Sequence, residues 1–399
     1  MVNLCVNWRI GVPTLLITIV AWYLGTDPLH LSIARGIKDF KPQYLAPAPF
    51  DVLANLSRDN ESKLHKKSQI WKVPFLGPES FVFDSQGRGP YTSVSDGRIV
   101  RYDGPELGWS TFAYTSKNRS EICAPKDPPA SNLAFEHVCG RPLGLRFNKK
   151  TGELWIADAY LGILKVGPEG GQTEAVVTHI DGVPMKLCND LDFDDDGILY
   201  FTDSSTRWTR RQFFLGTFEG DNTGRFIKYD PVTKETTTLI KDLRFSNEVA
   251  VSRDGTFVLI CDARNGRLVQ YWLQGEKAGM HHTFVILPGW PDNVRCNEEG
   301  DFWVALHSVR YAADTFLGTL PWLRYLLGRL PVPQKLLYQL AIGKPHAMIL
   351  RYDPEGNVKE VLEDQTGLSV RFVSEVEEHN GKLYIGSVLL PQIAVYPLQ

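Results

Sequence analysis

A phrase of two apolar strands joined by a tight turn recurs along the chain. In each copy a small or polar residue precedes a strand of alternating polarity, and a turn signal such as Asp-Gly, Asn-Gly, Glu-Gly or Thr-Gly leads to a second strand. A further strand of the type RFIKYD follows each pair. The copies begin at Pro78, Pro142, Cys188, Ser246, Pro291 and Val373. Six copies of about four strands predict an all-β fold, a six-bladed β-propeller of four-stranded blades, because a sandwich would not repeat so regularly.

The beginning of the chain has a different pattern. Residues 11–25 carry no charge, with Arg9 before them and Asp27 after them. This run is short for a membrane span, which needs about 20 residues, and fits a signal peptide or signal anchor over residues 1–27. A buried core helix is the alternative, and the lack of a small-x-small cleavage site favours an uncleaved anchor. We expect a lead-in segment over residues 28–70 and the propeller over residues 71–399.

Two insertions interrupt the repeat, residues 204–222 in blade three and residues 311–344 in blade five. The apolar residues of the second recur at helical spacing, so we expect a helical insertion. It could pack on the propeller rim, form a lid over an active site, or contact a membrane surface. Packing on the rim is the first expectation; Arg324, Arg329 and Lys335 among Leu and Trp residues support the membrane interpretation, in which residues 10–25 would take part as well.

Several features indicate the lumen of the secretory pathway, either the endoplasmic reticulum or the vacuole, or secretion from the cell. Cys123 and Cys139 bracket a Pro-rich loop, which suits a disulfide in an oxidising compartment. No CxxC pair exists, so a zinc site is not expected. The N-glycosylation sequons begin at Asn55, Asn60 and Asn118. Buried free thiols are expected at Cys188, Cys261 and Cys296.

Composition excludes other classes of protein. The net charge is −3 over 399 residues, which argues against a nucleic-acid partner, since such a protein needs a strong basic surface. Hydrophobic residues at 43% and charged residues at 22% exclude general disorder and a multi-span membrane protein. The chain has 34 Gly and 25 Pro beside only 4 Met, which fits many short strands and turns.

The residue just before each inner strand of a propeller points at the central axis. At this position the six copies carry Glu79, Leu143, Asn189, Asn247, Asp292 and Ser374. Four of these side chains offer carboxylate or amide oxygens, the ligands that Ca²⁺ prefers, and two negative charges balance one divalent cation. Asn293 could supply a further oxygen. The alternative is that Asn and Asp are turn residues here, but their shared phase in separate blades favours a calcium site.

The second strand of each blade ends on the same face as this set of oxygens. One step beyond such an end lies His307, the best candidate for a general base, because a neutral imidazole accepts a proton near pH 7. The alternative is a histidine that lines the channel mouth without a catalytic role. Asp190, next to Asn189, could orient a substrate.

The phrases CGRPLGL, NDLDFDDDG, TGRFIKYD and FSNEVAVSRDG resemble the strictosidine synthase-like proteins of plants and their animal relatives, the adipocyte plasma membrane-associated proteins. The resemblance runs from about Pro74 to the C-terminus, and it implies a disulfide between Cys123 and Cys139. The wider superfamily includes paraoxonases, regucalcin and gluconolactonases, and it implies a six-bladed propeller with central calcium.

The resemblance also separates two activities. In strictosidine synthase a glutamate begins the inner strand of the last blade, and the aligned residue here is Ser374, with Glu375 expected on the opposite strand face. The calcium-dependent hydrolases carry Glu, Asn, Asn and Asp around the channel, which matches Glu79, Asn189, Asn247 and Asp292. The histidine that paraoxonases place beside the metal corresponds to Leu143. The resemblance therefore implies that the base is another group: His307, Asp190 or Asp292.

Three functions follow from this pattern. The first is a calcium-dependent hydrolase of small apolar esters or lactones, and the second is a non-catalytic propeller that calcium stabilises. The third is a condensing enzyme of the strictosidine synthase type, which the replacement by Ser374 disfavours.

Overall fold

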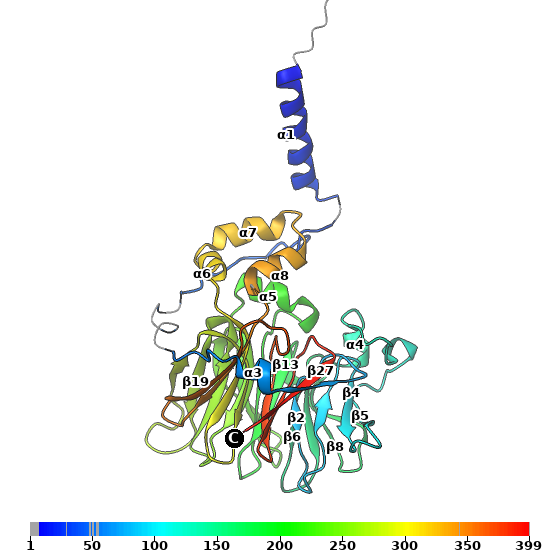
Figure 1. Ribbon diagram of the computed structural model, residues 1–399, viewed down its shortest axis with the longest axis vertical. Helices are drawn as coiled ribbons and strands as arrows, with labels where there is room; N and C mark the ends of the chain where they lie inside the picture. The colour runs from blue at the N-terminus through cyan, green and yellow to red at the C-terminus, as the bar shows by residue number, and fades with distance from the viewer. Residues whose placement is uncertain are drawn as a thin grey trace, which may run out of the picture.

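The computed structural model describes residues 8–28, 30–47, 49, 52, 56–342 and 344–398. Six antiparallel sheets follow one another around a central axis, as the repeat predicts (Figure 1). Each sheet runs outward from an inner strand, so the predicted six-bladed propeller is confirmed.

The first three blades are formed by residues 81–243. Blade one holds β2 (Phe81–Val82), β3 (Tyr91–Ser93), β4 (Arg98–Tyr102) and β5 (Trp109–Tyr114), and β9 (Gly171–Gln172) adds a fifth, parallel strand. Blade two holds β6 (Pro142–Phe147), β7 (Leu154–Asp158), β8 (Gly162–Val166) and β10 (Glu174–Val177). The hairpin of β11 (His179–Ile180) and β12 (Val183–Pro184) leads to blade three, which holds β13 (Cys188–Phe193), β14 (Leu199–Asp203), β15 (Gly224–Tyr229) and β16 (Thr236–Leu243).

The last three blades complete the ring. Blade four holds β17 (Ser246–Val251), β18 (Phe257–Asp262), β19 (Arg267–Trp272) and β20 (His281–Ile286). Blade five holds β21 (Gly289–Cys296), β22 (Phe302–Val309), β23 (Ala347–Tyr352) and β24 (Val358–Asp364). Blade six holds β25 (Val376–His379), β26 (Lys382–Ile385) and β27 (Gln392–Pro397), and its outer strand is β1 (Gln69–Lys72) from the other end of the chain. This pairing closes the circle.

The core lies between neighbouring blades. Each of the six blade interfaces holds its own cluster of buried apolar side chains, such as the cluster of Leu259, Val294 and Val304 between blades four and five. Both faces of every blade are therefore buried. Alternate residues of a strand point to opposite faces, so apolar side chains reach the interfaces with both neighbouring blades.

A layer of helices covers one end of the propeller (Figure 1). It consists of α5 (Phe213–Glu219) from blade three and α6 (Ala312–Thr319), α7 (Pro321–Arg329) and α8 (Gln334–Ile342) from blade five, which confirms the helical insertion. We call these four helices the cap. The shorter helices are η1 (Glu121–Cys123), α3 (Lys63–Lys67), α4 (Glu136–Cys139), η2 (Arg210–Gln212) and η3 (Ala263–Asn265).

The lead-in segment binds the cap together. Phe40 packs with Phe214, Phe218 and Leu337 in one apolar cluster. The buried guanidinium of Arg324 donates hydrogen bonds to the carbonyl oxygens of Phe218, at 2.7 Å, and of Gln43. The cap and the lead-in segment that packs against it thus come from three distant parts of the sequence.

Helix α1 (Trp8–Thr26) projects from the cap (Figure 1). Its described side chains are exposed apart from the half-buried Tyr23, with Ile17 at 68% and Trp22 at 58%. No helix among the described residues combines the length and the apolar character that crossing a membrane requires. The signal anchor over residues 1–27 stays a prediction.

Candidate functional site

A cavity of about 260 Å³ lies at the mouth of the central channel, between the inner strands and the cap. Most of its wall is apolar. The residues that form this apolar wall include Leu143, Leu187, Phe213, Phe214, Phe245 and Trp290. An apolar chamber with a few polar groups at its base is typical of a small-molecule site.

The inner strands bring the four predicted oxygen ligands into this one cavity. Its lining includes Glu79, Asn189, Asn247 and Asp292, each of which is at most 9% exposed. We call the six positions of the predicted set the upper ring. Ser374, its sixth member, does not line the cavity, and its hydroxyl accepts a hydrogen bond from the Val388 backbone N–H.

The upper ring is only partly satisfied by hydrogen bonds. The Asn247 amide nitrogen donates to an Asp292 carboxylate oxygen, and the Asn189 amide nitrogen donates to Ser204 Oγ at 2.8 Å. The Oδ1 atom of Asn247 is buried and has no hydrogen-bond partner. A buried, unpartnered carbonyl oxygen costs about 1–3 kcal/mol unless it finds a ligand.

Arg141, which the sequence reasoning missed, reaches the same ring. Its fully buried guanidinium lies 3.2 Å from Glu79 Oε2 and donates to the Gly77 carbonyl oxygen. Burial and repulsion by Asp292 raise the pKa of Glu79, although Arg141 opposes this shift. The only earlier signal for this residue was its place inside the phrase CGRPLGL.

Four inner strands break strict alternation at the upper ring. The pairing register shifts between Pro142 and Leu145, Cys188 and Leu191, Ser246 and Val249, and Pro291 and Val294. Such bulges let two consecutive side chains face the same side. A second layer of buried residues lies next to the upper ring, and we call it the lower ring: Ser80, Gly144, Asp190, Glu248, Asn293 and Glu375.

The lower ring surrounds the guanidinium of Arg295. This side chain donates to Asp190 Oδ2 at 2.9 Å, to Glu375 Oε1 at 2.6 Å and to Ser80 Oγ at 3.2 Å, and it also contacts Glu248. Although burial disfavours the charged form, Asp190 and Glu375 raise the pKa of Arg295. The guanidinium joins the inner strands of five blades.

This second layer changes the role of three predicted residues. Both carboxylate oxygens of Asp190 accept hydrogen bonds from Arg295, and Asp190 does not line the cavity, which argues against it as a base. The Asn293 amide donates to Glu375 Oε2 at 2.8 Å, so this side chain also belongs to the lower layer. Glu375, which was expected on the strand face opposite Ser374, does not line the cavity and accepts hydrogen bonds from Arg295.

His307 lies at the cavity wall, within reach of the upper ring. Its Nδ1 atom is 3.5 Å from Asp292 Oδ2, and its Nε2 atom is 3.1 Å from the hydroxyl of Tyr338. Tyr338 comes from α8 of the cap and was not predicted. Burial, with a contribution from Asp292, raises the pKa of Tyr338 to about 12. The tyrosine is therefore neutral at physiological pH and can donate a hydrogen bond.

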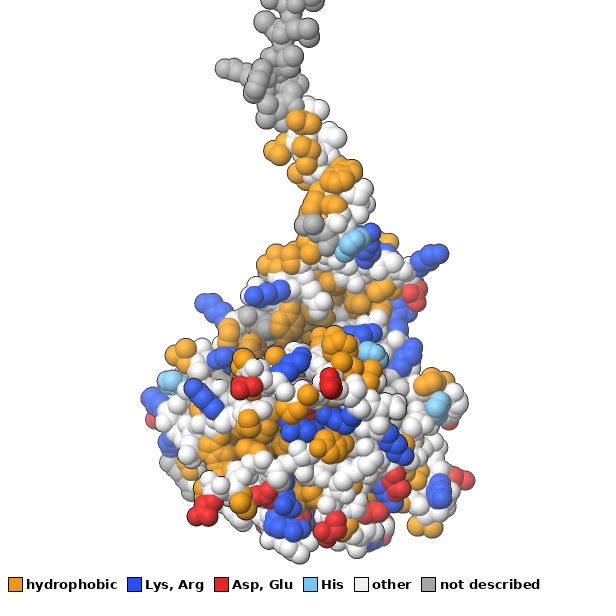
Figure 2. Space-filling view, turned by 90° about the vertical axis from the view of Figure 1, so that its right-hand side faces the viewer, with side chains coloured by type: hydrophobic (Ala, Val, Ile, Leu, Met, Phe, Trp, Pro, Cys, Tyr) orange, Lys and Arg blue, Asp and Glu red, His pale blue; other side chains and the backbone are white. Residues whose placement is uncertain are grey.

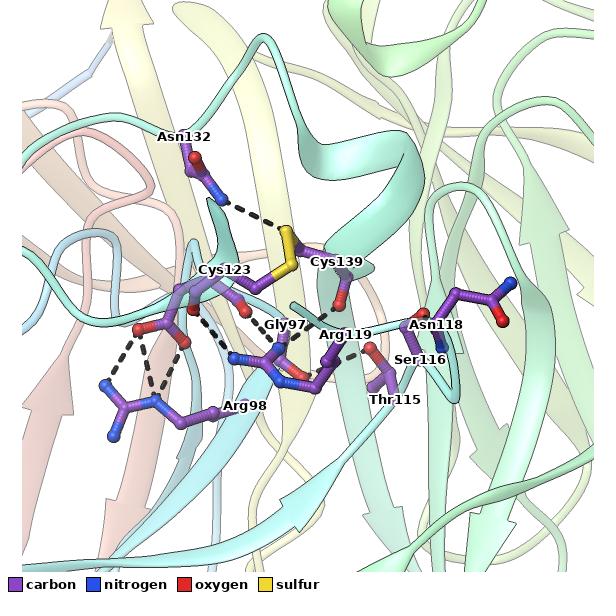
Figure 3. Close-up of a disulfide and its surroundings, with 10 residues drawn as sticks. Gly97, Arg98, Thr115, Ser116, Asn118, Arg119, Cys123, Asn132 and Cys139 are labelled. Atoms are coloured by element: carbon purple, nitrogen blue, oxygen red, sulfur yellow. Dashed lines mark hydrogen bonds and ion pairs between the residues drawn. A yellow bond between two sulfur atoms is a disulfide. The ribbon is translucent and has the colours of Figure 1, made fainter. Parts of the chain in front are cut away.

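The predicted disulfide between Cys123 and Cys139 is present (Figure 3). Arg119 donates to the Cys123 carbonyl oxygen at 2.8 Å. The loop that the disulfide closes places Glu136 at the cavity, where it binds the guanidinium of Arg210 at 3.1 Å. This ion pair connects the loop to η2, which leads directly into α5 of the cap.

The other predicted modification sites and thiols differ in exposure. Asn60 and Asn118 are exposed, as a glycan requires, whereas Asn55 lies outside the described residues. Burial raises the pKa of Cys188 and Cys261, which are fully buried, and also that of the partly buried Cys296. Glycosylation stays a prediction.

No group of three or more His, Cys, Asp or Glu side chains suited to a metal occurs among the described residues. The upper ring differs from such a group because two of its four oxygen ligands are amides. Carboxylate and amide oxygens are the ligands that a hard cation such as Ca²⁺ prefers.

Comparison with known proteins identifies the family. Residues 67–102 match the N-terminal region of strictosidine synthase-like proteins, and residues 189–276 match strictosidine synthase. Strictosidine synthase-like protein 3 of Arabidopsis thaliana is 48% identical over 381 residues, which cover 95% of this chain and 97% of that protein. The chain belongs to the strictosidine synthase-like family. The adipocyte plasma membrane-associated protein of Gallus gallus is 35% identical to this family member over 85% of the chain and 79% of the relative.

Solved structures share the fold of this strictosidine synthase-like protein. A gluconolactonase from Xanthomonas campestris superposes with a TM-score of 0.53 at 12% identity, covering 90% of this chain and 95% of its own. The calcium-binding protein regucalcin from Agrobacterium tumefaciens superposes with a TM-score of 0.51 at 13% identity, covering 82% and 96%. At such identities the likeness shows the propeller fold alone.

Proposed function

We propose that this strictosidine synthase-like protein hydrolyses small apolar esters or lactones with the help of Ca²⁺. The observation that carries this proposal is the convergence of Glu79, Asn189, Asn247 and Asp292 with an imidazole in one apolar cavity. Two proteins of the same fold support it, because one is named as a gluconolactonase and the other as a calcium-binding protein.

The residues of the upper ring fit the ion. The unpartnered Oδ1 of Asn247 offers a free carbonyl oxygen, and a cation would relieve the repulsion between Glu79 and Asp292. Arg141 neutralises only Glu79, and among the described residues the only ion-pair contact of Asp292 is with His307. When bound, Ca²⁺ would supply a Lewis acid for the carbonyl group of a substrate.

The side chains around the ring have distinct tasks. His307 accepts the proton of the attacking water at Nδ1, the nitrogen that faces the upper ring, and Asp292, whose Oδ2 lies 3.5 Å from Nδ1, stabilises the protonated imidazole. Tyr338 fixes the imidazole from the opposite side. The apolar wall excludes bulk water and limits the substrate to a small apolar molecule.

Condensation of the strictosidine type fits this geometry less well. Ser374 offers no base, and the neighbouring Glu375 is occupied by Arg295. A purely structural role for calcium is also disfavoured, because Arg295 already links the inner strands of blades one, three, four, five and six.

Turnover on a panel of aryl esters and lactones, with and without EDTA, tests the proposal. We expect Ca²⁺ to restore turnover and to raise the melting temperature of the wild-type protein. His307→Gln should lose about 100-fold in kcat/KM and keep the calcium-dependent rise. Asp292→Asn should lose both. A calcium-dependent melting temperature without turnover on any substrate would support the structural role instead.

We also propose that the protein resides in the secretory pathway, with its N-terminal helix at a membrane. The disulfide supports an oxidising compartment, and the relative named as plasma membrane-associated supports the membrane.

A further inference from the structure

The cap has an outer face that is rich in exposed apolar side chains. These residues come from α6, α7 and α8, and they are Phe316 at 60% exposed, Trp322 at 65%, Tyr325 at 48%, Leu326 at 45% and Leu336 at 48%. We call these five residues the apolar face. Large exposed apolar residues gathered on one layer mark a binding surface rather than ordinary surface variation.

The opposite side of the same layer covers the cavity. Leu337 is buried against the aromatic cluster of α5, and the next residue, Tyr338, reaches His307. Helix α8 therefore contacts both the outside through Leu336 and the cavity through Tyr338. A single layer of helices, about 10 Å thick, separates the apolar face from the cavity.

The chain connects α1 directly to this face. Two hydrogen bonds fasten the segment after α1 to the end of α7: the Ala34 N–H donates to the Gly328 carbonyl oxygen at 3.0 Å, and Ser32 Oγ donates to the Arg329 carbonyl oxygen at 2.9 Å. Figure 2 shows hydrophobic side chains on α1 and on the helices next to it. A surface that binds α1 would therefore lie close to α7.

The charge around the apolar face favours an anionic surface. The only acidic residue within positions 311–344 is Asp314, which is buried and paired with Arg264 at 3.2 Å. Lys335 is exposed beside the face, Lys38 and Lys41 are exposed on the lead-in segment, and the exposed Asp39 between them is paired with Arg207 at 2.7 Å. Lysine and arginine near a bilayer attract anionic headgroups. A bilayer would also cover the adjoining apolar helix α1, which favours it over a protein partner.

We propose that the apolar face of the cap lies on the surface of a bilayer that contains anionic lipid. Trp322 and Phe316 enter the headgroup region, Lys335 and the lead-in lysines contact the headgroups, and α1 extends the contact. The propeller then holds its cavity one helical layer from the lipid, in position to receive apolar molecules from the membrane. This inference does not depend on the proposed hydrolysis.

Sedimentation of the full chain with sucrose-loaded vesicles tests the inference. The vesicles consist of phosphatidylcholine with or without phosphatidylserine. The triple variant Phe316→Ser, Trp322→Ser, Leu326→Ser should bind at least ~10-fold more weakly than the wild type. The control Leu107→Ser, Val232→Ser removes residues that are 80% and 90% exposed on propeller turns, and should bind like the wild type.

A second measurement distinguishes the cap from α1. Brominated acyl chains quench the fluorescence of tryptophan that enters the bilayer, and Trp322→Phe should reduce this quenching while it keeps the face apolar. Trp109→Phe, on blade one, should leave quenching unchanged. Equal binding of all variants together with unchanged quenching in Trp322→Phe would overturn the inference. The inference would also be overturned if the wild-type protein did not bind vesicles and instead dimerised through this face.

Discussion

At the scale of the residue, the channel depends on the close approach of Gly144 to Asp190. A Cβ atom on Gly144 would lie 2.0 Å from Asp190 Oδ1 and 2.7 Å from Asp190 Cα. Since the backbone is one of the obstructing groups, no rotation of the carboxylate could relieve the contact. Asp190 is also held by Arg295. The absence of a side chain at Gly144 of blade two therefore leaves the space in which Asp190 of blade three binds Arg295.

We therefore expect Gly144→Ala to destabilise the protein by about 3 kcal/mol, because the new methyl group overpacks the lower ring and displaces Asp190. Urea denaturation followed by circular dichroism measures the effect. Gly167→Ala is the matched control: a Cβ there meets no atom within 4 Å, so its stability should change by less than about 1 kcal/mol. Equal effects of the two variants would mean that the lower ring tolerates displacement.

At the scale of the element, the sequence predicts the blades well because each blade repeats the same order of polar residue, inner strand, turn and second strand. The turn signals identify the inner strands, and the position before each strand leads to Glu79, Asn189, Asn247 and Asp292. The lower ring could not be predicted in this way, because strict alternation lets only one of two consecutive residues face the channel, whereas the register shifts of blades two to five let both do so, as at Asn189 and Asp190. Tyr338 and Arg141 were missed for another reason. Neither residue occupies the position that repeats from blade to blade, so the repeat gave no signal for them.

The disulfide loop is an element whose contribution can be measured. The Cys123–Cys139 bond closes a loop with a sequence separation of 16 residues. Its removal in the double variant Cys123→Ser, Cys139→Ser should cost about 3 kcal/mol and lower the melting temperature, because the unfolded chain gains freedom. Dithiothreitol should lower the melting temperature of the wild type similarly and leave the double variant unaffected. A reductant effect on the double variant would mean that another bond is being reduced.

At the scale of the whole molecule, strands from the N-terminal and C-terminal parts of the propeller pair with each other and close the ring of blades. Strand β1 completes blade six by pairing with β27, with Gln69 opposite Val395. Just before β1, the lead-in segment binds blade five: Arg58 donates two hydrogen bonds to the Glu363 carboxylate, at 2.6 and 2.5 Å, and the Asp59 N–H donates a third. The lead-in segment that joins the cap to the propeller is thereby fixed at Glu363 as well.

This attachment predicts a dependence of stability on pH. Although burial alone would raise it, hydrogen bonds from Arg58 and His346 lower the pKa of Glu363 from 4.5 to about 2. A carboxyl whose pKa is lower in the folded state stabilises the fold above its unfolded pKa, and this contribution is lost as the pH falls from about 4.5 towards 2. Glu363→Gln should therefore cost about 2 kcal/mol at pH 7 and progressively less at lower pH. Denaturation curves at pH 7, 5 and 3 measure the difference, and Glu355→Gln, at an exposed turn, should cost little at any of them. A constant difference between the wild type and Glu363→Gln across this range would show that the carboxylate charge does not fasten the lead-in segment.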